Sequence, residues 1–408
     1  MNILYINHYA GSPEMGMEFR PYYLAREWIK MGHNVDIIAA DFSHLRIKNP
    51  SVNKDFAVEV IDGINYYWVK TSKYDGNGAK RALTMAQFVS KLWLNAKRIA
   101  STLSPDVIIT SSTYPSDTYA GQRIKHFSKQ GTVLIHEVHD MWPITPMEMA
   151  GMSKWHPFIM LMQHGEDSFC KNSDYVVSLL PCAKEYFISH GMDTYKFHSV
   201  SNGIVLEEWQ SSVEIPNSLQ KTIDEMRENY KFILCFFGSH TQSYALTHII
   251  DAVKLLSRND VGLLFVGGGF YKKELIKYAD GIPNVKFHDS IPKVCIPQLV
   301  EAVDGLYVGA LRNKMFRFGI CMNKLFDSMM SGKPILYAVD APNNYIQEFN
   351  CGITVEAEDV EALRNGLEKL VNMSDEQREL LGKNGKNAVL ENFTYQKLAK
   401  KFAELFTK

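Results

Sequence analysis

The chain has 408 residues, of which 46% are hydrophobic and 22% are charged, and its formal net charge is −1. This length predicts two or three domains, and the composition is that of a globular protein with enough apolar residues for two cores. The balanced charge argues against nucleic acid as a main partner, because phosphate backbones select proteins with a basic excess.

The six cysteines are widely spaced and include no CxxC pair. This favours a reducing compartment and argues against a disulfide framework or a zinc knuckle. The chain opens with a strand-like run rather than a signal peptide, and no stretch approaches the roughly twenty apolar residues of a membrane span. We therefore expect a cytoplasmic protein, with peripheral contact at the inner face of the plasma membrane left open.

Strand-like and helical stretches alternate along the first half of the chain. A helix is predicted over residues 18–32 and ends at Gly32. The apolar runs around it lack strict alternation, as strands covered on both faces should, so they predict a parallel, doubly wound sheet. These strand-like runs cover residues 2–9, 34–41, 106–113, 132–140 and 175–180.

Residues 201–230 are polar and contain no convincing strand, and we interpret them as the crossing between domains. The alternation of strand-like and helical stretches then resumes, which predicts an α/β protein of two Rossmann-like domains with parallel sheets facing across a cleft. We expect an N-terminal domain at 1–205, a C-terminal domain at 206–385, and a segment at 386–408 whose amphipathic helix packs back on the first domain. The second set of strand-like runs covers residues 231–239, 261–269, 284–290, 305–311, 334–339 and 352–357.

Ligands of open α/β sheets bind beyond the carboxyl ends of the strands, where this chain has three glycine-bearing loops. The first loop holds Gly11 and Gly16 ahead of the helix that contains Arg20. Glycine there lets the backbone approach a phosphate closely. The spacing does not match the GxGxxG dinucleotide fingerprint, so a flexible surface loop is an equally good interpretation.

The other two loops follow strands of the second half. Gly238, Ser239 and His240 lie where backbone and hydroxyl donors could meet an anion at the start of the next helix. Residues 267–269 are three consecutive glycines, for which a tight turn is the simpler interpretation.

The stretch Phe316–Leu336, FRFGICMNKLFDSMMSGKPIL, is the strongest candidate for an anion site. Gly319 lets the backbone bend, and Asn323 and Lys324 fall in the first helical turn, where free N–H groups and the positive dipole end gather. A lysine there adds the charge that suits a diphosphate. Asp327 follows Asn323 by four residues on the same helix face, so it could bind ribose hydroxyls. The alternative is a surface helix with a solvated Lys–Asp pair.

In the first half, the run LIHEVHDMWPITP places His136, Glu137, His139 and Asp140 at the end of a strand. His139 and Asp140 finish the strand, where they could contact a hydroxyl-bearing substrate. A metal site is a second interpretation, but alternation sends His136 and His139 to opposite faces of the sheet, which argues against a shared His–His ligand set. A purely structural histidine is the third.

The segment Lys70–Arg98 contains one acid, Asp75, among many basic residues. The overlapping run LTMAQFVSKLWLNAKRIA, residues 83–100, predicts an amphipathic helix, and a basic helix of this kind could contact an anionic membrane surface through residues 80–99. Packing of the apolar face, with Phe88 and Trp93, into the domain is compatible with that contact. The basic residues of the segment are Lys70, Lys73, Lys80, Arg81, Lys91, Lys97 and Arg98.

Together these motifs resemble the retaining GT-B glycosyltransferases of family four, the group one glycosyltransferases, over nearly the full chain. FGICMNKLFDSMMSGKP is similar to the family's (P)NKLFEYMAAGKP signature. SDYVVSLLPCAKEYFISHG followed by SVSNGI matches the segment that ends the first domain at an Asn-Gly turn, here Asn202 and Gly203. EVHDMWP resembles the RDLWP-type stretch of the WbuB-like branch, which adds N-acetylated deoxy-sugars in bacterial surface polysaccharides.

The resemblance implies that the second domain holds a nucleotide-sugar donor and that the first domain binds the acceptor. Asp327 stands at the family's second glutamate, which binds ribose, and Gly319 stands where the first glutamate of the E-x7-E motif would be. Ser239 and His240 occupy the loop in which the family has an arginine and a lysine for the diphosphate. Lys324 and backbone amides would then carry more of that charge.

The implied reaction transfers a hexosyl group, with retention of configuration and without a metal or other cofactor, from a UDP-sugar or GDP-sugar to a hydroxyl of a lipid-linked or growing surface glycan. The branch resemblance favours UDP. Lys324, Asn323 and the Gly238–Ser239 loop would stabilise the departing diphosphate, while His139 or Asp140 positions the donor sugar or the acceptor. Two alternatives stay open: a GT-B epimerase acting on the nucleotide sugar, and a non-catalytic nucleotide-sugar-binding partner.

Overall fold

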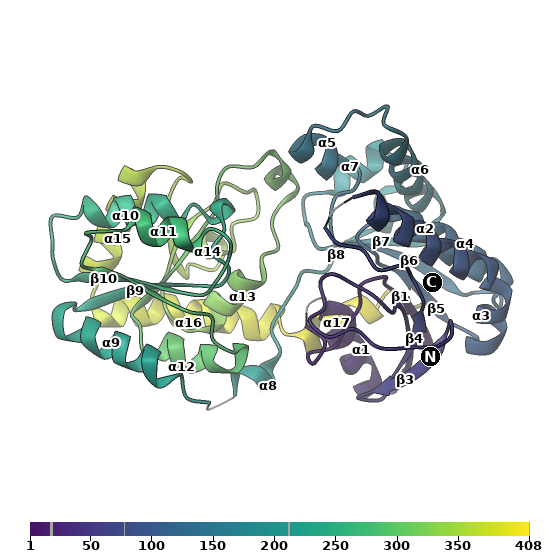
Figure 1. Ribbon diagram of the computed structural model, residues 1–408, viewed down its shortest axis with the longest axis horizontal. Coiled ribbons are helices and arrows are strands. Elements are labelled where there is room, and N and C mark those ends of the chain that lie inside the picture. The colour runs from purple at the N-terminus through teal and green to yellow at the C-terminus, as the bar shows by residue number, and fades with distance from the viewer. Residues whose placement is uncertain (17–18, 77, 211–212, 408) are drawn as a thin grey trace. The chain divides into compact units, whose positions relative to one another are not determined.

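The computed structural model describes residues 1–408 except 17–18, 77, 211–212 and 408. The chain divides into two compact units. The first consists of Met1–Asn202 and Tyr395–Lys408, and the second of Gly203–Thr394. Each unit is built on its own largely parallel sheet with helices packed against it (Figure 1). The predicted fold class of two α/β domains is therefore confirmed.

The sheet of the first unit has eight strands in the order β3-β4-β2-β1-β5-β6-β7-β8. Neighbouring strands run parallel except in the edge hairpin of β3 and β4, which is antiparallel. The strands are β1 (Asn2–Ile6), β2 (Asn34–Ala40), β3 (Ala57–Ile61), β4 (Ile64–Val69), β5 (Val107–Thr110), β6 (Val133–Val138), β7 (Tyr175–Ser178) and β8 (Phe197–Ser199).

Successive residues of β1 face opposite sides of this sheet. Leu4 joins an apolar cluster with Phe88 of helix α2 on one side. Tyr5 contacts Trp28 of α1 on the other side, and Trp28 also contacts Phe402 of α17. Helices α1 and α17 are labelled next to each other in Figure 1. The helices are α1 (Arg20–Lys30), α2 (Ala79–Leu94), α3 (Ala96–Leu103), η1 (Pro115–Asp117), α4 (Thr118–Phe127), α5 (Ile144–Ala150), α6 (Pro157–Asn172), α7 (Lys184–Ser189), η2 (Thr194–Lys196) and α17 (Tyr395–Ala403).

The second unit has a six-stranded parallel sheet in the order β11-β10-β9-β12-β13-β14. Apolar clusters cover both of its faces, because Cys235 of β9 packs with Phe326 on one side and Phe236 packs with Ile250 on the other. The strands are β9 (Phe232–Phe237), β10 (Val261–Val266), β11 (Val285–His288), β12 (Gly305–Gly309), β13 (Ile335–Ala338) and β14 (Gly352–Thr354). The helices are α8 (Leu206–Trp209), α9 (Asn217–Asn229), η3 (Gln242–Tyr244), α10 (Leu246–Lys254), α11 (Lys272–Tyr278), η4 (Lys293–Cys295), α12 (Ile296–Glu301), η5 (Lys314–Phe318), α13 (Asn323–Met330), α14 (Tyr345–Glu348), α15 (Val360–Asn372) and α16 (Asp375–Asn392).

Every predicted strand-like run contains a strand, whereas β3, β4 and β8 were not predicted. The helix expected over 18–32 is α1, whose predicted first residue, 18, lies outside the described residues. The units divide at 202/203 and 394/395, not at 205/206 and 385/386. Helix α16 continues through residue 386 because Ala388 and Val389 belong to the core of the second unit.

Candidate active site

Lys324, in the first turn of α13, carries the charge of the candidate site in the second unit. Its Nζ lies 4.1 Å from the ring centroid of Phe236 and 3.3 Å from that of Tyr244. Among the described residues this buried amine has no hydrogen-bond partner. Burial lowers the pKa of Lys324 to about 7, so the ammonium and the neutral amine are both populated near neutral pH.

Gly238, which follows β9, leaves room beside that amine. Its φ of +126° is a conformation that glycine adopts readily. A Cβ at residue 238 would lie 3.1 Å from Lys324 Nζ, so glycine at this position lets the backbone and the amine lie close together without a side chain between them.

The loops after β9 and β10 pack against each other through their backbones. His240 N donates to Gly268 O at 2.6 Å. A Cβ at Gly267 would lie only 1.9 Å from Gly238 O, and one at Gly269 only 2.4 Å from His240 O, so this approach explains the glycines at 267 and 269. Ser239, between these contacts, is exposed, as a hydroxyl donor to a ligand must be.

His240 contributes no charge to this loop. Its side chain is fully buried, and neither ring nitrogen has a hydrogen-bond partner among the described residues. Burial, together with Lys272 and Lys324 nearby, lowers the pKa of His240 to about 4. The ring is therefore neutral at pH 7, and the donors that this loop can offer an anion are the backbone and Ser239.

The start of α13 has no side-chain cap among the described residues. Its N-cap is Met322, and Asn323 at the first helical position is exposed. Gly319, with φ of +89°, turns the chain ahead of the helix, and Asn343 holds this loop by accepting a hydrogen bond from Ile320 N at 2.8 Å. The first-turn amides and the helix dipole thus resemble the anion site that the sequence predicted.

Asp327 and Lys324 do not form a solvated pair. Asp327 Oδ1 accepts a hydrogen bond from the indole N–H of Trp209, in α8, at 3.3 Å, and burial raises the pKa of its carboxyl. Lys324 instead contacts Phe236 and Tyr244. The alternative of an exposed Lys–Asp pair is therefore wrong, while ribose binding by Asp327 stays a prediction.

In the first unit, Glu137 is the centre of a buried charge network at the end of β6. Its carboxylate pairs with Arg20 of α1 at 2.9 Å and accepts hydrogen bonds from the Tyr5 hydroxyl at 2.5 Å and His139 Nε2 at 2.9 Å. Burial alone would raise its pKa, but Arg20 and His139 outweigh burial and hold the pKa of Glu137 well below its usual range. Glu137 is therefore an anion at every pH of interest.

His139 and Asp140 lie just beyond β6, as predicted; the His139 side chain is 11% exposed and Asp140 is exposed.

Sequence reasoning missed two polar residues that also follow strands. Asp117, buried ahead of α4, accepts a hydrogen bond from Ser112 N at 2.9 Å, and burial raises its pKa to about 7. His8, directly after β1, is also fully buried. The signal for both was a polar residue shortly after an apolar run.

His136 lies on the other side of the sheet from this network. Its Nδ1 is 2.8 Å from Thr110 Oγ1, and its ring stacks on Phe169 with the centroids 3.9 Å apart. His136 is therefore a satisfied structural histidine. This agrees with the prediction that it would not share a metal with His139.

Within the part of the chain that the structure describes, one group of side chains has the spacing of metal ligands. The ligand atoms of Glu166, Asp167 and His190 lie within 4.8 Å of one another. These residues belong to α6 and the end of α7 rather than to the strand ends. Gln163 and Tyr186 donate hydrogen bonds to Glu166, so protein hydrogen bonds already account for the buried carboxylate.

Two family models match the chain, one after the other. The model described as Glycosyltransferase Family 4 matches residues 15–208, and the model described as Glycosyl transferases group 1 matches residues 231–373. The chain is a glycosyltransferase of the type that these two models describe. The two matches cover most of the first unit and most of the second, in the order that the sequence motifs predicted.

This glycosyltransferase is 26% identical over 243 residues to the uncharacterized glycosyltransferase MJ1069 of Methanocaldococcus jannaschii, a match that covers 58% of this chain and 59% of the relative. Two solved structures are similar over nearly their whole length. Anabaena HepE in complex with UDP has a TM-score of 0.67 at 15% identity, with 99% of each chain covered. WaaG, a glycosyltransferase involved in lipopolysaccharide biosynthesis, has a TM-score of 0.64 at 16% identity, also with 99% of each chain covered. At these identities the likeness shows the shared GT-B fold.

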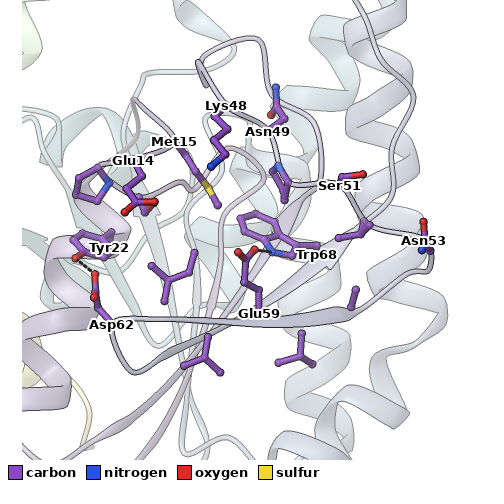
Figure 2. Close-up of a pocket in the computed structure, with 18 of the residues that line it drawn as sticks. Glu14, Met15, Tyr22, Lys48, Asn49, Ser51, Asn53, Glu59, Asp62 and Trp68 are labelled. Carbon is purple, nitrogen blue, oxygen red and sulfur yellow. Dashed lines mark hydrogen bonds between the residues drawn. The ribbon is translucent and has the colours of Figure 1, made fainter.

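The first unit of the glycosyltransferase has a hollow of about 1130 Å³ beside β3 (Figure 2). Aromatic donors hold two of its carboxylates: the Tyr22 hydroxyl donates to Asp62 at 2.5 Å, and the Trp68 indole N–H donates to Glu59 at 2.7 Å. Burial raises the pKa of Tyr22 to about 12, so its hydroxyl stays protonated. Further polar lining residues are Ser12, Glu14, Lys48, Asn49, Ser51, Asn53 and Lys54.

The basic helix of the glycosyltransferase buries its apolar side in the first unit. Phe88 and Leu92 of α2 are fully buried, and Trp93, 40% exposed, lies under the guanidinium of Arg123 at 3.5 Å. The packing interpretation is therefore confirmed, and membrane contact through 80–99 stays a prediction. Among the described residues, no helix has the length and apolar character of a membrane span.

Gly16 also lies in the first unit, in the loop after β1. Its φ is +76°, and a Cβ there would approach the side chain of Ile47 to 3.0 Å. This turn explains why glycine is needed at residue 16. Phosphate binding by Gly16 remains a prediction.

Proposed function

We propose that this protein is a retaining, metal-independent hexosyltransferase that uses a UDP-sugar donor and a hydroxyl acceptor on a lipid-linked or growing surface glycan. The observation that carries the proposal is the buried amine of Lys324 beside Gly238 and the uncapped start of α13. A lysine, free amides and a helix dipole together provide the contacts that a diphosphate requires. The UDP complex of HepE, which has a similar fold, supports UDP over GDP.

The chemistry follows from where charge develops. As the bond between the sugar and the diphosphate breaks, negative charge grows on the departing phosphate, and donors already aimed at that point lower the barrier. Lys324 supplies a proton-bearing amine, and Asn323 lies at the helix start beside it. This positive charge comes from the protein itself, so the proposal requires no divalent cation. The departing phosphate oxygen then takes the acceptor's proton while the new bond forms on the same face of the sugar, which retains the configuration.

We assign the acceptor to the first unit. His139 and Asp140 would position the reacting hydroxyl, and the hollow beside β3 would hold further sugars of the glycan. Its lining is nearly balanced in charge, with three acids and two lysines, which suits a neutral polyol better than a phosphate or a cation. Asp62 and Glu59 are already oriented by aromatic donors, as hydroxyl-binding carboxylates should be. The similarity to WaaG, a lipopolysaccharide enzyme, supports an envelope glycan.

The test is a transfer assay with panels of UDP-sugars and GDP-sugars and of lipid-linked acceptors, in the presence of EDTA. We expect turnover with a UDP-sugar and a product with the donor's anomeric configuration, which proton NMR reports. Lys324→Ala should lower kcat about 100-fold, the typical loss when one donor to a developing anion is removed. Lys273→Ala, at an exposed lysine of α11, is the matched control and should not change kcat. Failure to bind either nucleotide, or unchanged transfer by Lys324→Ala, contradicts the proposal.

The two alternatives give different results in the same assay. An epimerase converts the donor with no acceptor present, so the donor-only reaction identifies it. If the protein is a non-catalytic binding partner, the donor raises its melting temperature, but no sugar is transferred to any acceptor. Gly319 stands where the family motif has its first glutamate, so that carboxylate is missing, and its absence favours this second alternative.

A further inference from the structure

Glu137 lies at the strand end that carries His139, yet it is fully buried and cannot itself reach a substrate. We propose that Glu137 is a positioning residue for the transferase reaction: it fixes the orientation and the tautomer of the His139 ring, and Arg20 keeps it ionised for that role. This inference rests on the proposed function, in which His139 contacts a substrate.

The two carboxylate oxygens of Glu137 have separate partners. Oε1 faces Arg20, whose Nε and Nη2 both lie 2.9 Å away. Oε2 accepts the Tyr5 hydroxyl at 2.5 Å and His139 Nε2 at 2.9 Å. A buried carboxylate is stable only when it is paired and hydrogen-bonded, and Arg20 fulfils the first need. The second oxygen is thereby left to hold His139.

This arrangement determines which nitrogen of His139 carries the proton. An ionised carboxylate only accepts hydrogen bonds, so Nε2 of His139 must be the donor. In the neutral ring Nδ1 is then an acceptor, and in the charged ring it is a second donor. Either state can bind a sugar hydroxyl, and the bond from Nε2 keeps the ring from rotating.

Three acids act on His139, and the negative charge of each one favours the protonated ring. Glu137 contacts it, and Asp117 and Asp140 also interact with it electrostatically. His136 is on the opposite side of the sheet, and burial lowers its pKa to about 3, so it adds no charge. Glu137 is therefore the main group whose removal should lower the pKa of His139.

Arg20 joins this network to the end of the first unit. Its Nη2 donates to Val200 O at 2.9 Å and its Nη1 donates to Ser201 O at 2.5 Å. Asn202, the next residue, is where the chain leaves the unit. A single guanidinium thus stabilises both the anion behind His139 and the segment that leads out of the unit.

The first test is the protonation of His139 in the full-length wild-type protein, read from the nitrogen-15 shifts of its imidazole. We expect the neutral ring to carry its proton on Nε2. A proton on Nδ1 would overturn the inference, whether or not any variant folds. This spectrum needs no substrate, so it is distinguishable from a failure of the proposed function, which would appear as a wild-type protein without transfer activity.

The second test is Glu137→Gln, which keeps the size of the side chain and removes its charge. We expect kcat to fall about ten- to a hundredfold, the loss seen when a group that orients a metal-ligating histidine is removed, with the donor KM within about twofold of wild type. The limb of the pH profile that reports His139 should move down by about one pH unit or more. Tyr5→Phe, which keeps every charge, should lower kcat less and leave the pH limb in place.

Glu166→Gln is the matched control, because Glu166 is an equally buried carboxylate of the first unit, bonded to Gln163 and Tyr186. It should leave kcat, the pH profile and the His139 spectrum unchanged. If Glu137→Gln and Glu166→Gln lower activity and melting temperature equally, Glu137 acts only in folding, and the inference is overturned.

Discussion

Donor binding to the second unit should weaken as the pH rises above about 7, because Lys324 loses its proton there. Burial lowers the pKa of this lysine from 10.5 to about 7. A diphosphate binds the ammonium and gains nothing from the neutral amine, so binding requires proton uptake at alkaline pH. His240 does not obscure the effect, since its pKa of about 4 leaves it neutral over this range.

The size of the effect follows from that pKa. The ammonium form makes up about 76% of the free protein at pH 6.5 and about 3% at pH 8.5. If the bound diphosphate keeps the lysine charged, the dissociation constant should rise about 25-fold between these two values, which corresponds to about 1.9 kcal/mol.

Isothermal titration calorimetry with a UDP-sugar at a series of pH values measures this directly. A sugar nucleotide is preferable to UDP, because a terminal phosphate itself titrates near pH 6. Lys324→Met, which keeps most of the length of the side chain and removes its charge, should bind the donor weakly with little pH dependence. Lys273→Met, at the exposed control position, should keep the wild-type profile. A flat profile for the wild-type protein would refute the assignment of Lys324 to the diphosphate.

The same substitution tests the free energy that the buried amine costs the fold. The folded-state pKa of Lys324 lies below the unfolded one, so the unfolded chain binds more protons between about pH 7 and pH 10.5. The contribution of Lys324 to stability therefore rises with pH across that window and is least favourable below pH 7. Lys324→Met should raise the melting temperature most at pH 6 and least near pH 10. A lower melting temperature at pH 6 would show that the charged amine is already paired in the free protein.

Three further predictions concern other parts of the two units. Gly267→Ala should destabilise the protein by about 2 kcal/mol or more, seen in urea unfolding, because its Cβ would lie 1.9 Å from Gly238 O at a φ of +153°. Burial raises the pKa of Asp117 to about 7, so the contribution of Asp117 to the free energy of unfolding should fall from about pH 4 to pH 7 and stay level above. Over that range the stability of Asp117→Asn should fall by about 1 kcal/mol or more less than that of the wild-type protein, and identical pH curves would contradict this. Combining Glu59→Gln with Asp62→Asn should raise the acceptor KM about five- to tenfold at an unchanged donor KM, and equal changes in both would place the hollow outside the acceptor site.

The buried parallel strands could be predicted from the sequence because each is a short apolar run bounded by turn residues. The hairpin of β3 and β4 could not, since its residues do not form such a run. Val58 and Val60 of β3 are exposed, and polar Asn65 interrupts the start of β4. An edge hairpin is buried on fewer sides than a central strand, so it can contain polar residues and need not form a continuous apolar run.

Features of the candidate site that depend on neighbouring residues in the sequence could be predicted. Features that depend on residues far apart in the chain could not. The place of Lys324 at a helix start follows from the residues around it. Its aromatic neighbours, Phe236 of β9 and Tyr244 of η3, lie far from it in the sequence, and only the fold shows that they bury the amine. Glu137 is similar, because Arg20 stands 117 residues away from it in the chain. Contacts between such distant residues determine the pKa values of the site, and a short sequence motif does not contain them.

The lowered pKa of Lys324 limits the free energy that a buried lysine costs the fold when no diphosphate is bound. A permanently charged and unpaired ammonium between two aromatic rings would destabilise the unit, even with the partial compensation of cation–π attraction. A pKa near 7 lets the amine discharge when no anion is present, and a diphosphate arriving beside Gly238 would restore the proton. At pH 7 about half of the free molecules then carry the charge, and ligand binding protonates the rest. Lys324→Met should therefore stabilise the free protein and weaken donor binding in the same step, and a variant that improved both would show that the amine serves neither purpose.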